Sequence, residues 1–324
     1  MNPHEASRTA EYAAAFRALE TVRRPAKARL FEDPFAAAFL GPEILRYVRL
    51  AAMPILGGLV RSHVEWKSAG AMSSGIARTR LIDDWLREAL HEGLRRVVLL
   101  GAGYDCRAQR LPELADRRVV EIDHPATQAA KKERLQAILG ALPGNVTYLP
   151  ADLTKQNLED VWNHDGAQLN SASHVSNGWS TVQPCSIAGP SGDEPVFVLW
   201  EGVTHYLGEA AVDATLRALS RLCPPGSRLA FTYLHRGLLD GSLSFKRAQV
   251  ARDRVAQGGE PWIWGMDPAR LPEYLAERGF QLRKDLGADE YRALYWDAAA
   301  RRLQGFGFYH VAMAGVKEVQ RRVA

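Results

Sequence analysis

Two glycines and a series of acidic side chains stand where they could hold a small charged ligand. Gly101 and Gly103 directly follow the apolar run 97–100, and Asp123 lies 20 residues after Gly103, where a second apolar run ends. Glycines after a buried strand permit a tight turn and the close approach of a ligand. A carboxylate at this spacing suits hydrogen bonds from ribose hydroxyls. Together they predict a nucleotide-type binding corner rather than an ordinary tight turn between a strand and a helix.

Further acids follow the next two predicted strands. Asp152 comes shortly after the apolar run 145–150, and Glu201 directly follows the run 195–200. Because the carboxyl ends of parallel strands meet at one edge of an open sheet, these acids are expected beside Asp123. Asp152 could contact an adenine amino group, or it could instead cap the helix that follows it.

The residue at position 106 distinguishes between two cofactor classes. A dinucleotide-binding corner needs a third glycine there, where helix and strand pack closely, and this chain has Cys106. S-adenosylmethionine carries no pyrophosphate, so the missing glycine favours this cofactor over NAD. A nicotinamide-dependent oxidoreductase is therefore the less favoured enzyme. The alternative outside the enzymes is a non-catalytic cofactor-binding protein that acts through interaction.

One basic side chain is placed to bind the acidic end of such a ligand. Arg78 stands at the head of a helix predicted over 79–92, where a cation opposes the helix dipole. A solvated arginine would explain this position. The sharper hypothesis is that Arg78 forms a planar, two-pronged pair with a ligand carboxylate.

Three further side chains are candidates for catalysis. Methyl transfer to a carboxylate needs no general base, because a carboxylate is already ionised at pH 7. A phenol or alcohol acceptor does need one, and His205 and His235 are candidates by position, although each could equally be structural. Tyr206 lies near the expected cofactor edge, where it could belong to the core or touch the substrate.

Strands and helices alternate along the part of the chain that must position these residues. This order predicts an α/β fold whose mostly parallel sheet is covered by helices on both faces. The predicted strands are 97–100, 118–123, 145–150, 195–200, 228–234, a strand beginning at 281–283 and an antiparallel final strand over 307–314. The predicted helices are 79–92, 106–114, 126–139, 209–222, 242–257 and 268–278.

Two regions stand apart from this alternation. Residues 1–75 have a helical pattern, and we expect them to form an N-terminal helical cap on a cofactor-binding domain over 76–324. At about 163–194, polar residues, glycine and proline replace the apolar periodicity, which predicts a loop insertion before the fourth strand. The acceptor pocket is expected among the cap, this insertion and the segment 262–264.

Composition limits the other classes of function. The 324 residues carry a net charge of +4 without a long basic run, so nucleic-acid binding is not indicated. Three cysteines without metal-ligand spacing indicate no metal site and favour a reducing cytoplasm. No apolar run approaches the ~18 residues that a membrane-spanning helix needs, so no membrane partner is expected.

Several motifs together resemble one family. The segments concerned are 33–34, 77–80, 99–107, 121–125, 151–153 and 200–207. With them, most of the chain outside 163–194 resembles a class I S-adenosylmethionine-dependent methyltransferase of the leucine carboxyl methyltransferase family, in particular its bacterial branch. The resemblance implies a Rossmann-like, seven-stranded sheet. It also implies O-methylation of a carboxylate or hydroxyl on a small molecule or peptide.

The same resemblance implies roles for individual side chains. The methionine part of the cofactor is expected at Arg78, Gly101, Gly103 and Glu201, the ribose at Asp123 and Glu121, and the adenine at Asp152 and Leu153. Within this set, Arg78 is expected to hold the cofactor carboxylate and Glu201 its ammonium group. Arg17 could reach the carboxylate from the helical cap.

Overall fold

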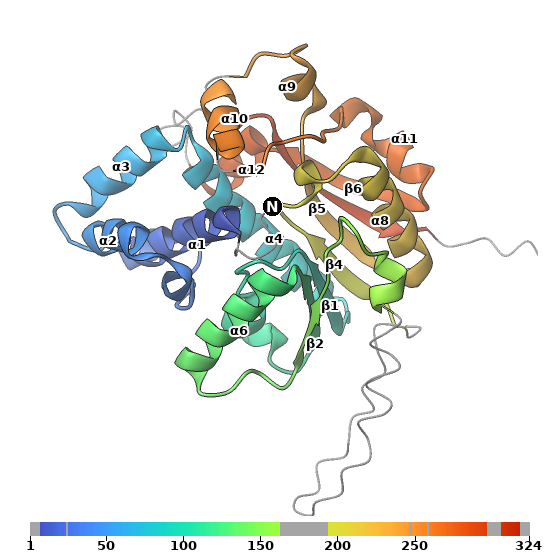
Figure 1. The fold of residues 1–324 in the computed structure, drawn as a ribbon, viewed down its shortest axis with the longest axis horizontal. Helices are drawn as coiled ribbons and strands as arrows, with labels where there is room; N and C mark the ends of the chain where they lie inside the picture. Colours follow the sequence, from blue (N-terminus) through green and yellow to red (C-terminus); the bar gives the residue numbers. More distant parts are fainter. Residues whose placement is uncertain are drawn as a thin grey trace, which may run out of the picture.

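The structure is a computed structural model and describes residues 7–23, 25–162, 194–245, 248–257, 259–296 and 306–317. Within this part, a seven-stranded sheet with the order β3-β2-β1-β4-β5-β7-β6 forms the centre of the molecule (Figure 1). Its strands are β1 (Arg96–Leu100), β2 (Arg118–Asp123), β3 (Val146–Pro150), β4 (Val196–Trp200), β5 (Arg228–Leu234), β6 (Phe280–Gly287) and β7 (Tyr309–Val316). β1 to β5 pair in parallel, and β7 is antiparallel to β5 and β6. The predicted α/β fold with a mostly parallel sheet is confirmed.

The register of the parallel strands brings their carboxyl ends to one edge. Leu100 of β1 lies opposite Ile122 of β2, and Asp123 lies opposite Pro150 of β3. β1, β4 and β5 form where the chain has short apolar runs, and they are buried along their whole length, as expected for strands covered on both faces. The residues that follow the parallel strands therefore meet at the same edge.

β7 brings its first residues to this edge as well. Because β7 runs antiparallel to β5, Tyr309 lies opposite Leu234, the last residue of β5. The amino end of the final strand thus joins the carboxyl ends of the parallel strands, although the two segments are far apart in the sequence.

Helices cover both faces of the sheet. They are α4 (Ala71–His91), α5 (Arg107–Arg110), α6 (Pro125–Leu139), α8 (Glu209–Leu222), α9 (Arg236–Asp240), α10 (Ala248–Gln257), α11 (Leu271–Ala276) and α12 (Ala288–Tyr295). Successive strand residues point to opposite faces, so Leu99 belongs to one apolar core and Val98 to another. α4 and α12 close the first core, and α8 and α11 close the second.

The described residues before α4 are helical and contain no strand. They form α1 (Arg8–Thr21), α2 (Pro42–Ala51) and α3 (Gly57–Lys67) with two short 3-10 helices, and they gather to one side of the sheet in Figure 1. α4 runs across residue 75, so the division into a cap over 1–75 and a domain over 76–324 stays a prediction. The predicted insertion at about 163–194 lies outside the described residues, apart from Glu194. In the ranges described, no helix is long and apolar enough to cross a membrane.

α4 begins at Ala71 rather than at Thr79, where the sequence analysis placed its start. The buried side chain of Glu65, on α3, accepts a hydrogen bond from the N–H of Ser73 at 2.8 Å and another from the Ser73 hydroxyl. It thereby satisfies a donor that the first turn of a helix leaves open. Arg78 therefore lies within α4 and not at its head, and the expected conflict with the helix dipole does not arise.

The helix predicted over 106–114 is also shorter than expected. α5 is a single turn, and a 3-10 turn at Pro112–Leu114 follows it. Leu111 is extended, with φ −94° and ψ 110°, as expected for a residue before proline, and Pro112 has no N–H to continue a helix. The helix that follows the glycine corner is therefore only one turn long.

Ile82 on α4 tests the core between this helix and the sheet. Its side chain has no exposed surface, so Ile82→Ala would leave a cavity there. We expect the free energy of unfolding, measured by urea denaturation, to fall by roughly 2–5 kcal/mol. Leu294→Ala, on α12 with 61% of the residue exposed, is the control and should change that free energy by less than about 0.5 kcal/mol. Equal losses in the two variants would contradict this description of the core.

Candidate active site

A cavity of about 1080 Å³ lies at the edge where the parallel strands end. One side is formed by residues that follow β1, β2, β3 and β4, and the other by α1, α2, α3 and the first turns of α4. Open α/β sheets bind ligands at this edge, and ligand pockets usually measure about 300–1,000 Å³. The cavity is therefore placed and sized to hold a cofactor together with a second small molecule.

Most of the predicted site residues line this cavity. Each of them lies either at or just beyond the end of a parallel strand or on one of the helices that face the strand ends. They are Arg17, Arg78, Gly101, Gly103, Asp123, Asp152, Leu153, Glu201, His205 and Tyr206. Glu121 and His235 are not among the lining residues. Across the described ranges, no group of three or more His, Cys, Asp or Glu residues could hold a metal ion.

The corner after β1 requires glycine at two positions. Gly101 and Gly103 have positive φ angles of 65° and 49°, which residues with side chains rarely adopt. A Cβ on Gly101 would clash with Cγ2 of Val203, and one on Gly103 would lie 3.3 Å from Cβ of Ala10. Glycine is therefore required at both positions by the backbone conformation and by the packing of neighbouring side chains, and both residues line the cavity.

Asp123 is fixed beside this corner by backbone donors. The N–H of Gly103 donates to one carboxylate oxygen, and the N–H of His124 donates to the other at 2.6 Å. Burial raises the pKa of Asp123, and these two hydrogen bonds act against the rise. The carboxylate is thus held on the cavity wall, where it can accept hydrogen bonds from the hydroxyls of a ligand.

Glu121 occupies a different environment from Asp123. Its side chain is buried, and Oε2 lies 2.5 Å from Nζ of Lys131 on α6. Burial raises the pKa of Glu121 to about 7, although Lys131 favours the ionised form. Because Glu121 stands two residues before the end of β2, α6 covers it. The structure thus corrects the expected ribose contact and makes Glu121 half of a core ion pair.

Asp152 and Leu153 border the cavity just after β3. Oδ1 of Asp152 accepts hydrogen bonds from the N–H of Thr154 at 3.0 Å and from its hydroxyl at 2.5 Å. Oδ2 forms an ion pair with Lys155 at 3.1 Å. Asp152 therefore stabilises the local turn and borders the cavity at the same time, so the two alternatives for it do not exclude each other.

Arg78 and Glu201 meet on the cavity wall as an ion pair. Nε of Arg78 lies 2.7 Å from Oε1 of Glu201, and Nη1 of Arg107 lies 2.9 Å from Oε2. Burial alone would raise the pKa of Glu201, but the two guanidinium groups hold it below its usual range, so this carboxylate is ionised at pH 7. The guanidinium of Arg78 also lies over the ring of Tyr309, 4.8 Å from its centroid.

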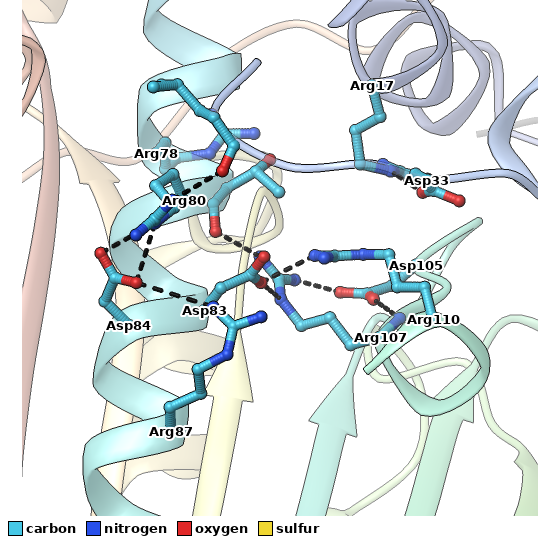
Figure 2. A network of polar contacts seen from close by, with 12 residues as sticks. Arg17, Asp33, Arg78, Arg80, Asp83, Asp84, Arg87, Asp105, Arg107 and Arg110 are labelled. Atoms are coloured by element: carbon cyan, nitrogen blue, oxygen red, sulfur yellow. Dashed lines mark hydrogen bonds and ion pairs between the residues drawn. The ribbon is translucent and has the colours of Figure 1, made fainter. Parts of the chain in front are cut away.

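Arg107 joins this pair to a buried cluster of charges, which Figure 2 shows between α4 and the turn after β1. Nε of Arg107 lies 2.8 Å from Asp83 on α4, and Nη1 also contacts Asp105. Arg110 shares Asp83 at 2.7 Å. These charges lower the pKa of Asp105 to about 2 in spite of its burial. Because an incomplete set of buried charges is costly, the cluster fixes the turn after β1 against α4.

Arg17 reaches the cavity from α1 and is already held by protein groups. Its Nε lies 2.8 Å from Asp33, beside it in Figure 2, and its Nη2 donates to the carbonyl of Tyr104. Asp33 also accepts hydrogen bonds from the backbone N–H groups of Phe35 and Ala36. The 33–34 segment therefore positions an arginine at the cavity wall.

The two candidate histidines are placed differently. His205 lies on the cavity wall with 2% of the residue exposed, and burial, together with the charge of Arg78, lowers its pKa to about 3. Nδ1 of His235 accepts a hydrogen bond from the N–H of Gly237 at 3.0 Å and caps the start of α9. The structure therefore does not bring His235 to the site, because its ring turns back onto its own chain.

Aromatic side chains on the cavity wall were mostly missed by the sequence analysis. Trp262, Phe306 and Tyr309 line the cavity beside His205 and Tyr206. The segment 262–264 was expected near the acceptor pocket, and Trp262 is indeed there. Phe306 and Tyr309 could not be found in the same way, because the sequence predicts an antiparallel final strand but not its pairing with β5, which brings the start of that strand to the site.

The fold and the glycine corner define the class of protein. A methyltransferase structure from Thermobifida fusca superposes with a TM-score of 0.52 at 19% identity, covering 90% of this chain and 94% of that one. A DUF574 family protein from Streptomyces avermitilis gives a TM-score of 0.52 at 14% identity, over 97% and 99% of the two chains. The sheet is that of the class I S-adenosylmethionine-dependent methyltransferases.

Sequence comparison specifies the family. The model of the leucine carboxyl methyltransferase family matches residues 10–176. A relative from Mycobacterium marinum, whose name places it among the S-adenosyl-L-methionine-dependent methyltransferases, is 31% identical over 307 residues, which cover 91% of this chain and 90% of the relative. The chain belongs to the leucine carboxyl methyltransferase family, and its cofactor is S-adenosylmethionine. A nicotinamide-dependent oxidoreductase and a non-catalytic binding protein are correspondingly disfavoured.

Gly101→Ala tests the corner directly. The added Cβ meets Val203 and the positive φ becomes strained, so we expect the affinity for S-adenosylhomocysteine, measured by calorimetry, to fall by at least roughly tenfold. Gly144→Ala is the matched control, because nothing lies within 4 Å of its Cβ position. Unchanged affinity in Gly101→Ala would show that cofactor binding does not depend on the conformation of this corner.

Proposed function

We propose that this protein transfers the methyl group of S-adenosylmethionine to a carboxylate oxygen of a small-molecule or peptide acceptor. When bound, the cofactor supplies a methyl group that its sulfonium has already activated. The acceptor oxygen forms the new C–O bond as the C–S bond breaks, and the electron pair of that bond stays on sulfur. A neutral ester and a neutral thioether remain. The protein then has to hold the acceptor in line, which is catalysis by positioning.

The environment of His205 most favours a carboxylate, because its ring is buried against the rings of Tyr206 and Trp262 with 2% of the residue exposed. With its pKa near 3, His205 is neutral at pH 7 and too weak a base to take the proton of a phenol or alcohol. Burial raises the pKa of Tyr206, which therefore stays protonated. A carboxylate acceptor ionises near pH 4 without help, so it suits a wall with these two side chains.

The Arg78–Glu201 pair supports a role for these residues in binding the methionine part of the cofactor. That part carries a carboxylate and an ammonium group, which are complementary to a guanidinium and a carboxylate. In this proposal, Arg78 holds the carboxylate and Glu201 holds the ammonium group. Asp123 accepts the ribose hydroxyls, and Asp152 with Leu153 borders the adenine.

Arg107 has a positioning role in the same proposal. It occupies the second oxygen of Glu201, so this carboxylate keeps a partner and its orientation when Arg78 turns to a ligand. Arg110 makes a suitable comparison, because it shares Asp83 with Arg107 whereas Glu201, among the described residues, pairs with Arg78 and Arg107. Substitution of Arg107 therefore affects both Glu201 and the buried cluster, whereas substitution of Arg110 affects the buried cluster. Comparing the two isolates the effect on Glu201.

Arg107→Met should weaken binding of S-adenosylhomocysteine by roughly 10- to 100-fold, as expected when a hydrogen bond to a charged group is lost. It should weaken binding of 5′-methylthioadenosine, which lacks the amino-acid part, by a clearly smaller factor, because that ligand does not need Glu201, and Arg107→Lys should restore part of the loss. Calorimetry with both ligands gives these values. A structural role alone would weaken both ligands alike, and a selective loss in the control Arg110→Met would also contradict the proposal.

The pH dependence of methyl transfer tests the acceptor group. For an acceptor carboxylate, kcat/KM should change far less than tenfold per pH unit between pH 6 and 8, because the acceptor ionises near pH 4 and His205 near pH 3, both below this window. The rate should fall only as the acceptor is protonated at lower pH. The rate is measured as the formation of methyl ester from S-adenosylmethionine with a labelled methyl group. A rate that rises about tenfold per pH unit through neutrality would indicate a phenol or alcohol instead.

A further inference from the structure

Five aromatic rings form a continuous wall in the cavity, and this wall bears on the acceptor. The inference rests on the proposed function, because it names the acceptor class of the same cavity. The residues, called the aromatic wall below, are His205, Tyr206, Trp262, Phe306 and Tyr309. They come from the turn after β4, the segment after α10 and the start of β7.

Three pairs of these rings pack edge to face. The centroid of His205 lies 6.0 Å from that of Trp262 at 88° and 5.6 Å from that of Tyr309 at 75°. Trp262 and Phe306 are 6.2 Å apart at 87°. Aromatic rings prefer this arrangement, because the positive edge of one ring meets the negative face of the next. Tyr206, Trp262 and Phe306 are only partly buried, so part of their ring surface remains available to a ligand.

The aromatic wall begins where the proposed methionine site ends. The guanidinium of Arg78 lies over the ring of Tyr309, and His205 follows Glu201 after a short turn. Because the sulfur that carries the methyl group adjoins the methionine part of the cofactor, an acceptor oxygen must reach this end of the cavity. The acceptor body then lies against the aromatic wall rather than beside Asp123 and Asp152.

The start of α1 contacts the segment after α10 at this part of the cavity. The hydroxyl of Ser7 donates to Oε1 of Glu260 at 3.3 Å, and the hydroxyl of Thr9 donates to Oε2. Ala251 and Val255 add apolar lining from α10. An acceptor that packs on this lining removes apolar surface from water, which favours a flat apolar body over a flexible polar one.

We propose that the acceptor is an arene carboxylate whose ring lies on the aromatic wall with its carboxylate toward the Arg78–Glu201 end. A saturated ring of similar size fills the same space but has neither the negative face nor the polarised edge of an arene. An arene carboxylate also meets the requirement for an acceptor that is ionised without a base. The aromatic wall thus selects the ring, and the chemistry at the cofactor selects the carboxylate.

Paired probes test this assignment. Benzoate and 2-naphthoate are compared with cyclohexanecarboxylate and decalin-2-carboxylate, by calorimetry on the full chain saturated with S-adenosylhomocysteine. We expect at least one arene to bind about threefold to tenfold more tightly than its saturated partner. Trp262→Leu and, separately, Phe306→Leu should reduce this preference toward unity. Trp66→Leu is the control, because Trp66 lies on α3 with 67% of the residue exposed and does not line the cavity.

Several outcomes would overturn the arene assignment. They are equal affinities within each probe pair, no binding of any arene, and a preference that persists in both wall variants while S-adenosylhomocysteine still binds. The same measurement of S-adenosylhomocysteine affinity shows whether each variant has folded. Failure of the proposed function is seen in a separate measurement. If the protein methylates arene phenols to ethers and forms no ester, the aromatic wall still binds the ring of the acceptor, but the acceptor group is not a carboxylate.

Discussion

The ionic contacts of Arg107 are the constraint on which the site depends. Its guanidinium contacts carboxylates from three segments, namely Asp83 on α4, Asp105 after β1 and Glu201 after β4. These groups are largely removed from water, so each is stable only while its partners stay in place. The long helix and the sheet edge are therefore fixed relative to each other. The glycine corner and the acidic strand ends can form one surface because this connection holds them together.

The electrostatics of the cavity differ between the groups that suit ligand binding and the group that could take a proton. Glu201 stays ionised between two guanidinium groups, whereas His205 stays neutral because it is buried beside a cation. The wall thus offers fixed charges that suit a zwitterion, and His205 is no proton acceptor at neutral pH. Such an arrangement fits a reaction whose electrophile arrives already activated and whose nucleophile arrives already ionised.

Much of the fold and of the cofactor corner could be predicted, because it depends on local sequence. Short apolar runs specify the parallel strands, and the glycine pair specifies the turn that Asp123 joins. Features that depend on packing between distant segments could not be read in this way. Glu65 extends α4 beyond its predicted start, α6 covers Glu121 with Lys131, and the pairing of β7 with β5 decides where Tyr309 lies. No periodic pattern in the sequence signals the contacts of Glu65 with Ser73 and of Glu121 with Lys131.

The late position of β7 in the chain has a consequence for biosynthesis. The strands that carry the glycine corner and the acidic ends are β1 to β4, and they leave the ribosome well before Tyr309 does. The nucleoside half of the cavity can therefore form while the nascent chain is still growing. The aromatic half is completed only when the last strand inserts between β5 and β6. A prematurely terminated chain would thus contain the glycine corner and the acidic strand ends without Tyr309 and the strand that carries it.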